Sequence, residues 1–194
     1  MAAEITGELP GLVDHRFSRA TYQLMVEAGI FTSNDKLELI GGWIVAKSPQ
    51  GFLHVRAVPR LDKLLQGLCG SSAEVFVQMP YPAGDDSMPE PDLYLTRPGA
   101  GEHSWPDHAL LVIEVADSSL QYDRATKSAV YAATGVAEYW VVDVRGQLIE
   151  VYREPRGDHY GAVRTALLGD SVDVLALPGV AIGVDAVVGE RVAG

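Results

Sequence analysis

Periodic patterns of hydrophobic and polar residues divide the chain into short helices and strands in mixed order. Residues 17–29 carry apolar side chains at helical spacing between Ser18, a typical N-cap, and Gly29, a typical C-terminal residue of a helix. Residues 36–40 and 43–47 are strand-like and flank a Gly-Gly turn. We therefore expect the fold to begin with a helix and a β-hairpin.

A second helix is predicted by an apolar stripe at helical spacing, which comprises Val55, Val58, Leu61, Leu64, Leu65 and Leu68. Another face of this helix is basic and carries Arg56, Arg60 and Lys63 at i, i+4 and i+7. Pro59 falls within the pattern. Because proline lacks an N–H group, Pro59 either kinks the helix or stands in the first turn of a shorter helix that begins near Val58.

The middle of the chain predicts three strands and a third helix. Residues 74–79 and 91–95 have the composition of strands. Residues 109–115 form a continuous apolar run between polar segments, as expected for a central strand that is buried on both faces. The third helix is expected over residues 123–134, with Gly135 at its C-terminal end.

The last third of the chain is rich in strand patterns. Residues 139–143 and 148–152 are separated by a short turn, and further short strands are expected over about 159–188, with a turn at 177–180. No repeat, low-complexity tract or linker interrupts the order. Residues 1–194 are therefore expected to form one α/β domain, with its core at about 17–153.

Composition is typical of a globular domain that stays out of the membrane. Hydrophobic residues make up 47% of the chain and aromatic residues 8%. The longest apolar stretch, residues 109–113, is far shorter than the ~18 residues of a membrane span. The N-terminal residues are acidic and lack the apolar region of a secretory signal. We expect a cytoplasmic protein with no membrane partner.

The cysteine content excludes several kinds of site. The chain has one cysteine, Cys69, so neither an intrachain disulfide nor a thiolate cluster for zinc or iron–sulfur is available. We expect Cys69 to be a small buried side chain on a helix.

The formal net charge of −11 opposes non-specific attraction to phosphate backbones. Any role in nucleic-acid binding must overcome this charge. A group of carboxylates that holds a cation would explain part of the acidic excess, and solvated surface residues would explain the rest.

Glu114 and Asp92 are the first candidates for chemistry. Glu114 follows five apolar strand residues, where desolvation of a carboxylate costs several kcal/mol unless something compensates. The alternative is that the strand ends there and Glu114 reaches water. Asp92 opens the preceding strand, so strand pairing would bring both carboxylates to one edge of the sheet. Two carboxylates suit Mg²⁺, which keeps several waters for substrate phosphates.

A second Pro-Asp pair and several common motifs are excluded as the source of the chemistry. Asp107 would lie about 20 Å or more from Glu114 along an extended strand. Ser118-Ser119 lacks the glycines of a serine-hydrolase elbow, and no histidine is placed for a triad. Walker loops, Rossmann glycine fingerprints and paired-histidine zinc motifs are absent from the sequence.

The third helix places Asp123, Lys127 and Tyr131 on one face, at i, i+4 and i+8. This face of the helix can be directed toward the end of the Glu114 strand. An ammonium group there could orient an attacking water and neutralise developing charge on a phosphate. The alternative is a surface pair between Asp123 and Lys127 that supports the helix by a few tenths of a kcal/mol.

The order Pro91-Asp92, then Glu114-Val115, then Lys127 on the next helix resembles the PD-(D/E)XK nuclease superfamily. The wider sequence resembles the Uma-two branch of restriction-type endonucleases over most of the chain. The matching residues are Leu37-Glu38-Leu39-Ile40, Gly42, Ser48-Pro49, His54, Glu114-Val115, Ser119, Asp123, Lys127, Tyr131, Gly135-Val136 and Glu138-Tyr139-Trp140.

The resemblance implies a restriction-endonuclease-like mixed sheet flanked by helices, with the N-terminal helix and β-hairpin as additions. It implies that Asp92, Glu114 and the Val115 carbonyl bind Mg²⁺, with Mn²⁺ as a substitute, and that Lys127 is the catalytic lysine. Glu38 matches an acid on the first hairpin that supports the metal, although it is also typical of a solvated strand residue. His54 is a weaker match.

One position differs from the basic superfamily pattern, and two further positions depart from the family pattern. The basic superfamily pattern has its lysine two residues after the glutamate, where this chain has Ala116; in this branch the lysine stands on the helix. Gly41-Gly42-Trp43 replaces an acidic turn, and Pro59 interrupts the helix expected to start near His54. The last two departures weaken a role for His54 and for the first hairpin.

Two functions follow from this pattern. The first is a Mg²⁺-dependent phosphodiesterase that acts on nucleic acid, with DNA as the expected substrate. The second is a non-catalytic domain that keeps the nuclease fold for binding or assembly, which the acidic charge supports. The basic stripe of Arg56, Arg60 and Lys63 could contact phosphates, but such a stripe is usually a solvated helix face. The sequence leaves a homodimer open.

Overall fold

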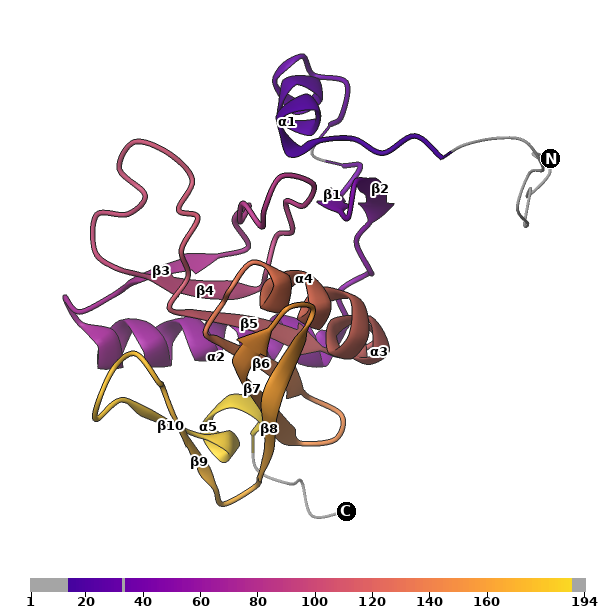
Figure 1. Cartoon of the computed structure of the whole chain (residues 1–194). Coiled ribbons are helices and arrows are strands. Elements are labelled where there is room, and N and C mark those ends of the chain that lie inside the picture. The colour runs from indigo at the N-terminus through magenta and orange to yellow at the C-terminus, as the bar shows by residue number, and fades with distance from the viewer. Residues whose placement is uncertain (1–13, 33, 190–194) are drawn as a thin grey trace.

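The computed structural model describes residues 14–32 and 34–189, and its centre is a six-stranded mixed sheet (Figure 1). The strand order is β3-β4-β5-β6-β7-β8, in which β5 and β6 are parallel and all other neighbours are antiparallel. The strands are β3 (Glu74–Val77), β4 (Leu93–Thr96), β5 (Leu111–Ala116), β6 (Glu138–Asp143), β7 (Leu148–Arg156) and β8 (His159–Leu167).

Helices and two small hairpins surround this sheet. The helices are α1 (Arg19–Glu27), α2 (Phe52–Cys69), α3 (Leu120–Tyr122), the π-helical turn η1 (Asp123–Lys127), α4 (Ser128–Ala133) and α5 (Val184–Val188). The hairpins pair β1 (Leu37–Ile40) with β2 (Trp43–Ala46) and β9 (Ser171–Asp173) with β10 (Ala181–Gly183). The mixed α/β order and the hairpin at Gly41-Gly42 confirm the sequence-based predictions.

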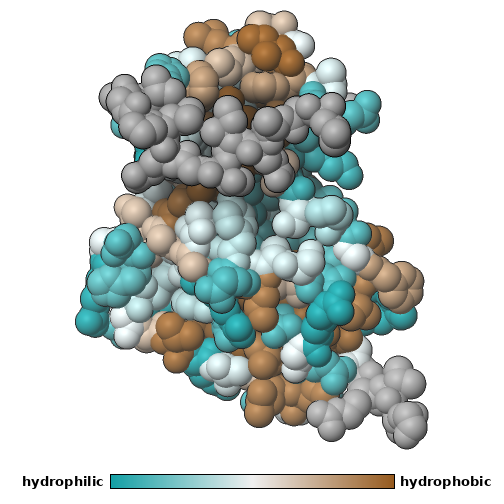
Figure 2. Space-filling view, turned by 90° about the vertical axis from the view of Figure 1, so that its right-hand side faces the viewer, coloured by the Kyte–Doolittle hydropathy of each residue, from teal (hydrophilic) through white to brown (hydrophobic). Residues whose placement is uncertain are grey.

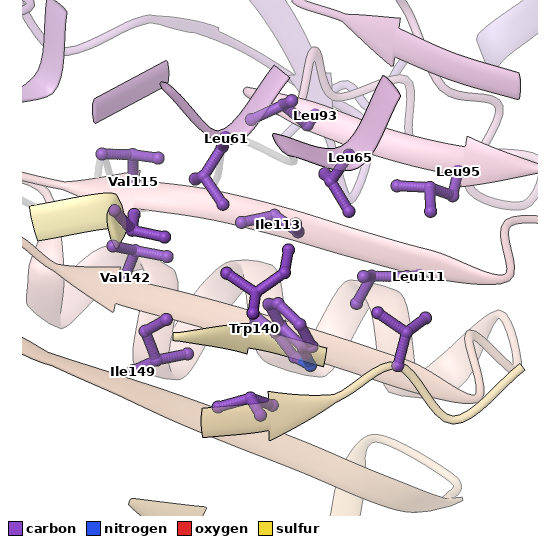
Figure 3. Close-up of a cluster of buried hydrophobic side chains, with 14 of the residues drawn as sticks. Leu61, Leu65, Leu93, Leu95, Leu111, Ile113, Val115, Trp140, Val142 and Ile149 are labelled. Carbon is purple, nitrogen blue, oxygen red and sulfur yellow. The ribbon is translucent and has the colours of Figure 1, made fainter. Parts of the chain in front are cut away.

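One face of the sheet packs against α2 and α5 through a large aliphatic core (Figure 3). Leu61 and Leu65 of α2 lie over Leu93, Ile113 and their neighbours in the sheet, and all of these side chains are buried. Cys69 belongs to this core, as predicted for a small buried side chain. This face therefore supplies much of the hydrophobic burial that stabilises the fold.

The opposite face packs against α4 and is rich in tyrosine. The buried aromatic residues of this cluster are Tyr81, Tyr94, Tyr131, Tyr139, Tyr152 and Tyr160. Successive residues of a strand point to opposite faces, so Ile113 and Val115 enter the aliphatic core while Val112 and Ala116 enter the tyrosine cluster. By the same alternation Glu114 lies on the α4 face, where hydroxyl groups are available to it.

α1 and the β1–β2 hairpin form a small unit at the top of Figure 1. Ser18 caps α1 by accepting a hydrogen bond from the Thr21 N–H at 3.1 Å. The unit has its own core of Tyr22, Leu39 and Met88. An isolated bridge between Leu39 and Met88 connects the hairpin to the chain that leads into β4. This bridge fixes the hairpin beside the end of the main sheet.

Of the two alternatives for Pro59, the shorter helix that begins near Val58 is wrong. α2 begins at Phe52 and continues through Pro59 to Cys69. Proline removes the hydrogen bond that the Val55 carbonyl would accept, but both residues lie on the exposed face of α2, where water can replace it. The predicted stripe was also partly wrong, because Val55 and Leu68 are 53% and 45% exposed.

The C-terminal prediction needs two corrections. β8 is nine residues long and pairs along the length of β7, so it is not a short strand. Val184–Val188 is a helix that the sequence did not predict, because three of its five residues are β-branched valines. Val184 and Val187 are buried three residues apart against the aliphatic core, and this packing selects the helix.

The third helix starts earlier than predicted, at Leu120, and contains the π-helical turn η1.

Within residues 14–32 and 34–189, no helix combines the length and apolar character needed to cross a bilayer.

Candidate functional site

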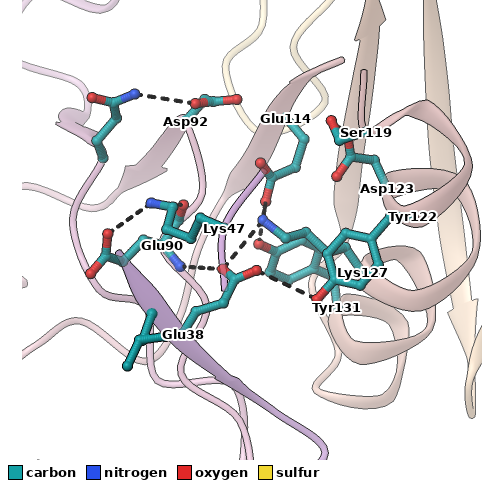
Figure 4. A network of polar contacts seen from close by, with 12 residues as sticks. Glu38, Lys47, Glu90, Asp92, Glu114, Ser119, Tyr122, Asp123, Lys127 and Tyr131 are labelled. Atoms are coloured by element: carbon teal, nitrogen blue, oxygen red, sulfur yellow. Dashed lines mark hydrogen bonds and ion pairs between the residues drawn. The ribbon is translucent and has the colours of Figure 1, made fainter. Parts of the chain in front are cut away.

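A polar cleft of about 270 Å³ lies where β5 ends, between the β1–β2 hairpin and the segment α3–η1 (Figure 4). All five residues predicted as catalytic or metal-binding line this cleft, namely Glu38, Asp92, Glu114, Val115 and Lys127. They come from β1, the residue before β4, β5 and η1. The sheet thus brings together side chains that are up to 89 positions apart in the sequence, from Glu38 to Lys127.

The Asp92 carboxylate is held by three donors. Its Oδ2 accepts a hydrogen bond from the Val115 N–H at 2.8 Å, and its Oδ1 accepts one from His54 Nε2 at 2.9 Å. The Gln78 amide donates to Oδ1 at 3.4 Å. In a strand the N–H and C=O of one residue point to the same side, so the Val115 carbonyl is directed toward the side that Asp92 occupies.

Glu114 is 4% exposed and therefore does not reach bulk water, which excludes the solvated alternative. Its Oε1 accepts hydrogen bonds from Lys127 Nζ and the Tyr131 hydroxyl, both at 2.8 Å. Burial raises the pKa of Glu114 to about 8; Lys127 opposes this shift, and Asp123, Asp92 and Glu38 reinforce it. The strand continues for two residues beyond Glu114, so the carboxyl is built into the sheet.

Lys127 bridges two carboxylates inside the protein. Its Nζ lies 2.8 Å from Glu114 Oε1 and 3.5 Å from Glu38 Oε2, and the residue is 5% exposed. Burial alone would lower the pKa of Lys127, but the carboxylates of Glu114 and Glu38 raise it above its usual value. Lys127 therefore remains a cation and compensates the buried negative charge.

The predicted alternative of a surface pair between Asp123 and Lys127 is wrong, because both residues are buried. Asp123 accepts a hydrogen bond from the Ser119 hydroxyl at 2.5 Å. Burial raises the pKa of Asp123 to about 6, although the bond from Ser119 and the charge of Lys127 oppose the shift. The i, i+4, i+8 prediction was correct, since Asp123, Lys127 and Tyr131 are all buried on the side that faces the sheet.

The π-helical turn is held on both of its sides. The Tyr139 hydroxyl donates to the Asp123 carbonyl at 3.1 Å, beneath the turn. Arg124 donates from Nε and Nη2 to the Glu150 carboxylate on β7, at 2.9 and 2.7 Å. π-Turns often occur at functional sites, and this one directs Asp123 and Lys127 into the cleft.

His54 has a closer relation to the site than the sequence suggested. It is buried in the first turn of α2 and lines the cleft. Because an ionised Asp92 can only accept, Nε2 of His54 is the nitrogen that carries the proton. Its Nδ1 is buried and has no hydrogen-bond partner among the residues that the structure describes. The imidazole therefore fixes the orientation of Asp92 at the cost of one unmet polar atom.

Four further contacts were missed at the level of sequence. The Tyr122 hydroxyl donates to Glu38 Oε1 at 3.4 Å, and the Glu90 N–H donates to Glu38 Oε2 at 3.2 Å. Lys47 forms an ion pair with Glu90 at 2.8 Å at the mouth of the cleft. Gln78 reaches Asp92 from the loop after β3. No sequence motif marks these residues, because only the strand pairing brings them to the site.

The donor set fits Mg²⁺ in its chemistry. Mg²⁺ typically takes one or two carboxylates, and fills its remaining positions with water and substrate phosphate. Asp92, Glu114 and the Val115 carbonyl offer such a set of hard oxygen atoms. Within the described ranges 14–32 and 34–189, there is no group of three His, Cys, Asp or Glu side chains that could hold a metal ion by themselves. An ion would therefore depend on main-chain, water or phosphate oxygen as well.

The second Pro-Asp pair, at Asp107, lies outside the cleft. The Asp107 side chain is 71% exposed and lies on the loop before β5, at the opposite end of that strand from Glu114. The sequence-based decision against Asp107 agrees with this position.

The fold is shared with a solved structure from Anabaena variabilis ATCC 29413, described as "a putative nuclease belonging to DUF820". The TM-score is 0.68 at 16% sequence identity, and the match covers 89% of this chain and 97% of that chain. This likeness confirms the predicted nuclease-type sheet. A comparison with curated proteins gives no match.

The sequence also matches the Uma2 family, described as "Putative restriction endonuclease", over residues 20–185. This range includes every residue of the cleft and most of the chain. The resemblance inferred from the dispersed motifs is thereby confirmed, and the protein belongs to the Uma2 family.

Proposed function

We propose that the protein is a Mg²⁺-dependent endonuclease-like phosphodiesterase that hydrolyses nucleic acid, with DNA as the substrate and Mn²⁺ as a substitute ion. The observation that carries the proposal is the meeting of Asp92, Glu114 and Lys127 in one cleft. Membership of a restriction-endonuclease family and the nuclease fold support the same reaction class.

The charge of the cleft supports a role for a cation. Six acidic residues line it against two lysines: Glu38, Glu90, Asp92, Glu114, Asp117 and Asp123 with Lys47 and Lys127. A phosphodiester would be repelled by this lining unless positive charge were added. A bound Mg²⁺ would supply a Lewis acid for the phosphate and lower the pKa of a water ligand.

The protein side chains have separate roles in the proposed reaction. Asp92 and Glu114 bind the ion, and the bond from His54 keeps Asp92 in one orientation. Lys127 exchanges its contact with Glu114 for a phosphate oxygen or the attacking water, and offsets the developing negative charge. The oxygen of the attacking water would bond to phosphorus and release its proton to solvent water. The bond from phosphorus to the leaving oxygen would break, and the leaving oxygen would take a proton from solvent water.

A cleavage assay tests the proposal. Single- and double-stranded DNA and RNA are incubated with the protein in Mg²⁺, in Mn²⁺ and in a chelator. We expect ion-dependent internal cleavage of DNA, lost in Glu114→Gln and kept in Asp107→Asn, a matched change of an exposed acid outside the cleft. Cleavage that survives Glu114→Gln or the chelator would contradict the proposed site.

The alternative is a non-catalytic binding or assembly domain with the nuclease fold. Its support is the closed pair between Lys127 and Glu114, which compensates the buried charges without an ion. In that case neither Mg²⁺ nor Mn²⁺ would bind the cleft, and none of the four nucleic acids would be cleaved. Analytical ultracentrifugation of the same preparation tests the homodimer that the sequence leaves open.

A further inference from the structure

A second groove of about 470 Å³ opens beside the cleft, between α1, the β1–β2 hairpin and the chain that follows β3. We call it the α1 groove, and it is lined by Tyr22, Val26, Phe31, Thr32, Lys36, Leu37, Lys47, Ser48, Gln50, Gln78 and Glu90. Four of these residues, Lys47, Ser48, Gln50 and Glu90, also line the cleft. A ligand that extends from the cleft can therefore continue directly into the α1 groove.

The sign of the charge changes between the two spaces. The cleft has an excess of carboxylates, whereas the charged residues of the α1 groove are Lys36, Lys47 and Glu90. Lys47 and Glu90 neutralise each other through their ion pair at 2.8 Å. Lys36 is exposed, and it forms no ion pair with any carboxylate in the described part of the chain. The charged residues that line the groove thus leave one net positive charge, that of Lys36, whereas those of the cleft leave a net negative charge.

The groove also has an aromatic and apolar wall. Phe31 is half-buried against Tyr22, with the two ring centroids 5.9 Å apart, and Val26 adds an exposed aliphatic side chain. In the view of Figure 2 hydrophobic residues gather at the top of the molecule, where α1 lies. Nucleobases stack on aromatic side chains whatever their sequence.

Two residues of the groove have strained backbones. Lys36 and Gln78 have φ angles of 46° and 51°, which non-glycine residues rarely adopt. Each is held there by a hydrogen bond: the Lys36 carbonyl accepts from the Lys47 N–H at 2.8 Å, and the Gln78 N–H donates to the Asp92 carbonyl at 3.0 Å. Gln78 also joins the groove to the cleft through its side-chain contact with Asp92.

We propose that the α1 groove binds one nucleotide of a substrate strand next to the phosphate that lies in the cleft. The base lies against Phe31, and its phosphate lies near Lys36. The size of the groove is within the range of about 300–1,000 Å³ that small-ligand pockets have. This inference rests on the proposed function, because it takes nucleic acid as the ligand of the cleft.

The basic stripe on α2 is the competing surface. Two of its three residues are engaged within the protein: Arg60 donates to the Val187 carbonyl at 3.2 Å, and the Arg56 guanidinium lies over the Phe52 ring at 5.5 Å. Only Lys63 of the stripe extends without such a contact in the described structure. Neither contact is an ion pair, so both guanidinium groups keep their charge, and the stripe remains the competing surface for phosphates.

Binding of a fluorescein-labelled single-stranded DNA, followed by anisotropy with Ca²⁺ in place of Mg²⁺, distinguishes the two surfaces. Lys36→Met should weaken binding about tenfold and reduce the slope of log affinity against log salt by about 0.7, the loss of one phosphate contact. Phe31→Ala should weaken binding by a similar factor without changing that slope. The matched controls Lys63→Met and Phe52→Ala should leave both quantities unchanged. Thermal melting confirms that each variant is folded.

The outcomes separate this inference from the proposed function. Binding that depends on Lys36 and Phe31 in a protein that never cleaves would refute the catalysis and support the groove. Normal binding by Lys36→Met and Phe31→Ala in a protein that does cleave would overturn the groove alone. A loss of binding confined to Lys63→Met would place the bound strand on α2 and would also overturn the proposal for the α1 groove. A parent protein that binds no nucleic acid would refute both proposals.

Discussion

Replacement of Lys127 by methionine tests the buried charge network most directly. Methionine keeps much of the aliphatic stem and removes the ammonium that lies 2.8 Å from Glu114 and 3.5 Å from Glu38. We expect Lys127→Met to fold, to bind Mg²⁺ at least as well as the parent, and to lose about two or more orders of magnitude in cleavage rate. The ammonium competes with an ion for the same Glu114 oxygen, so its removal does not weaken ion binding at a pH above the pKa of Glu114, where the ion has no proton to displace.

The stability cost of this substitution depends on pH. Removal of one partner of a buried ion pair costs about 3–5 kcal/mol when the other partner stays charged. Glu114 can avoid that cost by taking a proton, because its pKa is about 8 even with Lys127 present, and loss of Lys127 raises it further. At neutral pH the carboxyl of the variant is therefore protonated, and the cost is smaller.

The direction of the pH effect on stability follows from the protonation of Glu114 in the folded and the unfolded protein. A carboxyl whose pKa is raised on folding from 4.5 keeps a proton that the unfolded chain has lost, so stability falls as pH rises toward the folded pKa. In the parent this loss ends near pH 8, whereas in Lys127→Met it continues above pH 8. The difference in free energy of unfolding between the two proteins should grow there by up to about 1.4 kcal/mol per pH unit.

Thermal melting at about pH 6.5 and pH 9.5 measures this difference, with Lys63→Met as the control for an exposed lysine. Cleavage rates and calorimetric Mg²⁺ titrations complete the assay. An equal stability difference at both pH values would show that Glu114 does not carry the proton. Cleavage within a few-fold of the parent would refute the role of Lys127 in the reaction.

Three further predictions concern the carboxylates. Asp92→Asn and Glu114→Gln should each weaken Mn²⁺ binding strongly in calorimetry, since each removes a charged oxygen ligand at constant size; unchanged affinity in both would exclude the site. His54→Asn should weaken Mn²⁺ binding about 10- to 100-fold because its amide is too short to reach Asp92, whereas His54→Gln should restore it; equal affinities would show that His54 does not orient Asp92. Millimolar Mn²⁺ should raise the melting temperature of the parent, more at about pH 9 than at pH 6, because the ion must displace the proton held by Glu114; no shift at either pH would favour the non-catalytic domain.

Most elements of the fold could be predicted because their hydrophobic patterns are local. The apolar run around Ile113 gave the central strand, and the Gly41-Gly42 turn gave the hairpin. The errors occurred where packing outweighs local preference. Val184 and Val187 form a helix only because the aliphatic core covers them, and Pro59 is tolerated only because its face of α2 meets water.

The cleft was predictable to the extent that its residues form a motif. Asp92, Glu114 and Lys127 could be named because strand pairing and helical spacing bring them to one place. The contacts that orient them could not. Gln78 reaches Asp92 from a loop with a left-handed backbone, and His54 reaches it from a helix that Pro59 was predicted to interrupt. Such contacts depend on how distant segments pack and leave no pattern along the chain.

Lys127 lies on a helical turn, whereas a lysine two residues after Glu114 would lie on the same strand as that carboxylate. Ala116, two residues after Glu114, is buried in the same strand and on the same face, so a lysine there would be rigidly attached to the carboxylate. Lys127 instead belongs to η1, which is anchored to the sheet by the Tyr139 hydroxyl and by the pair between Arg124 and Glu150. A shift of this turn would move the ammonium while the carboxylates stay in place. The position of the ammonium is thus set by η1, and the positions of the carboxylates of Asp92 and Glu114 are set by the sheet.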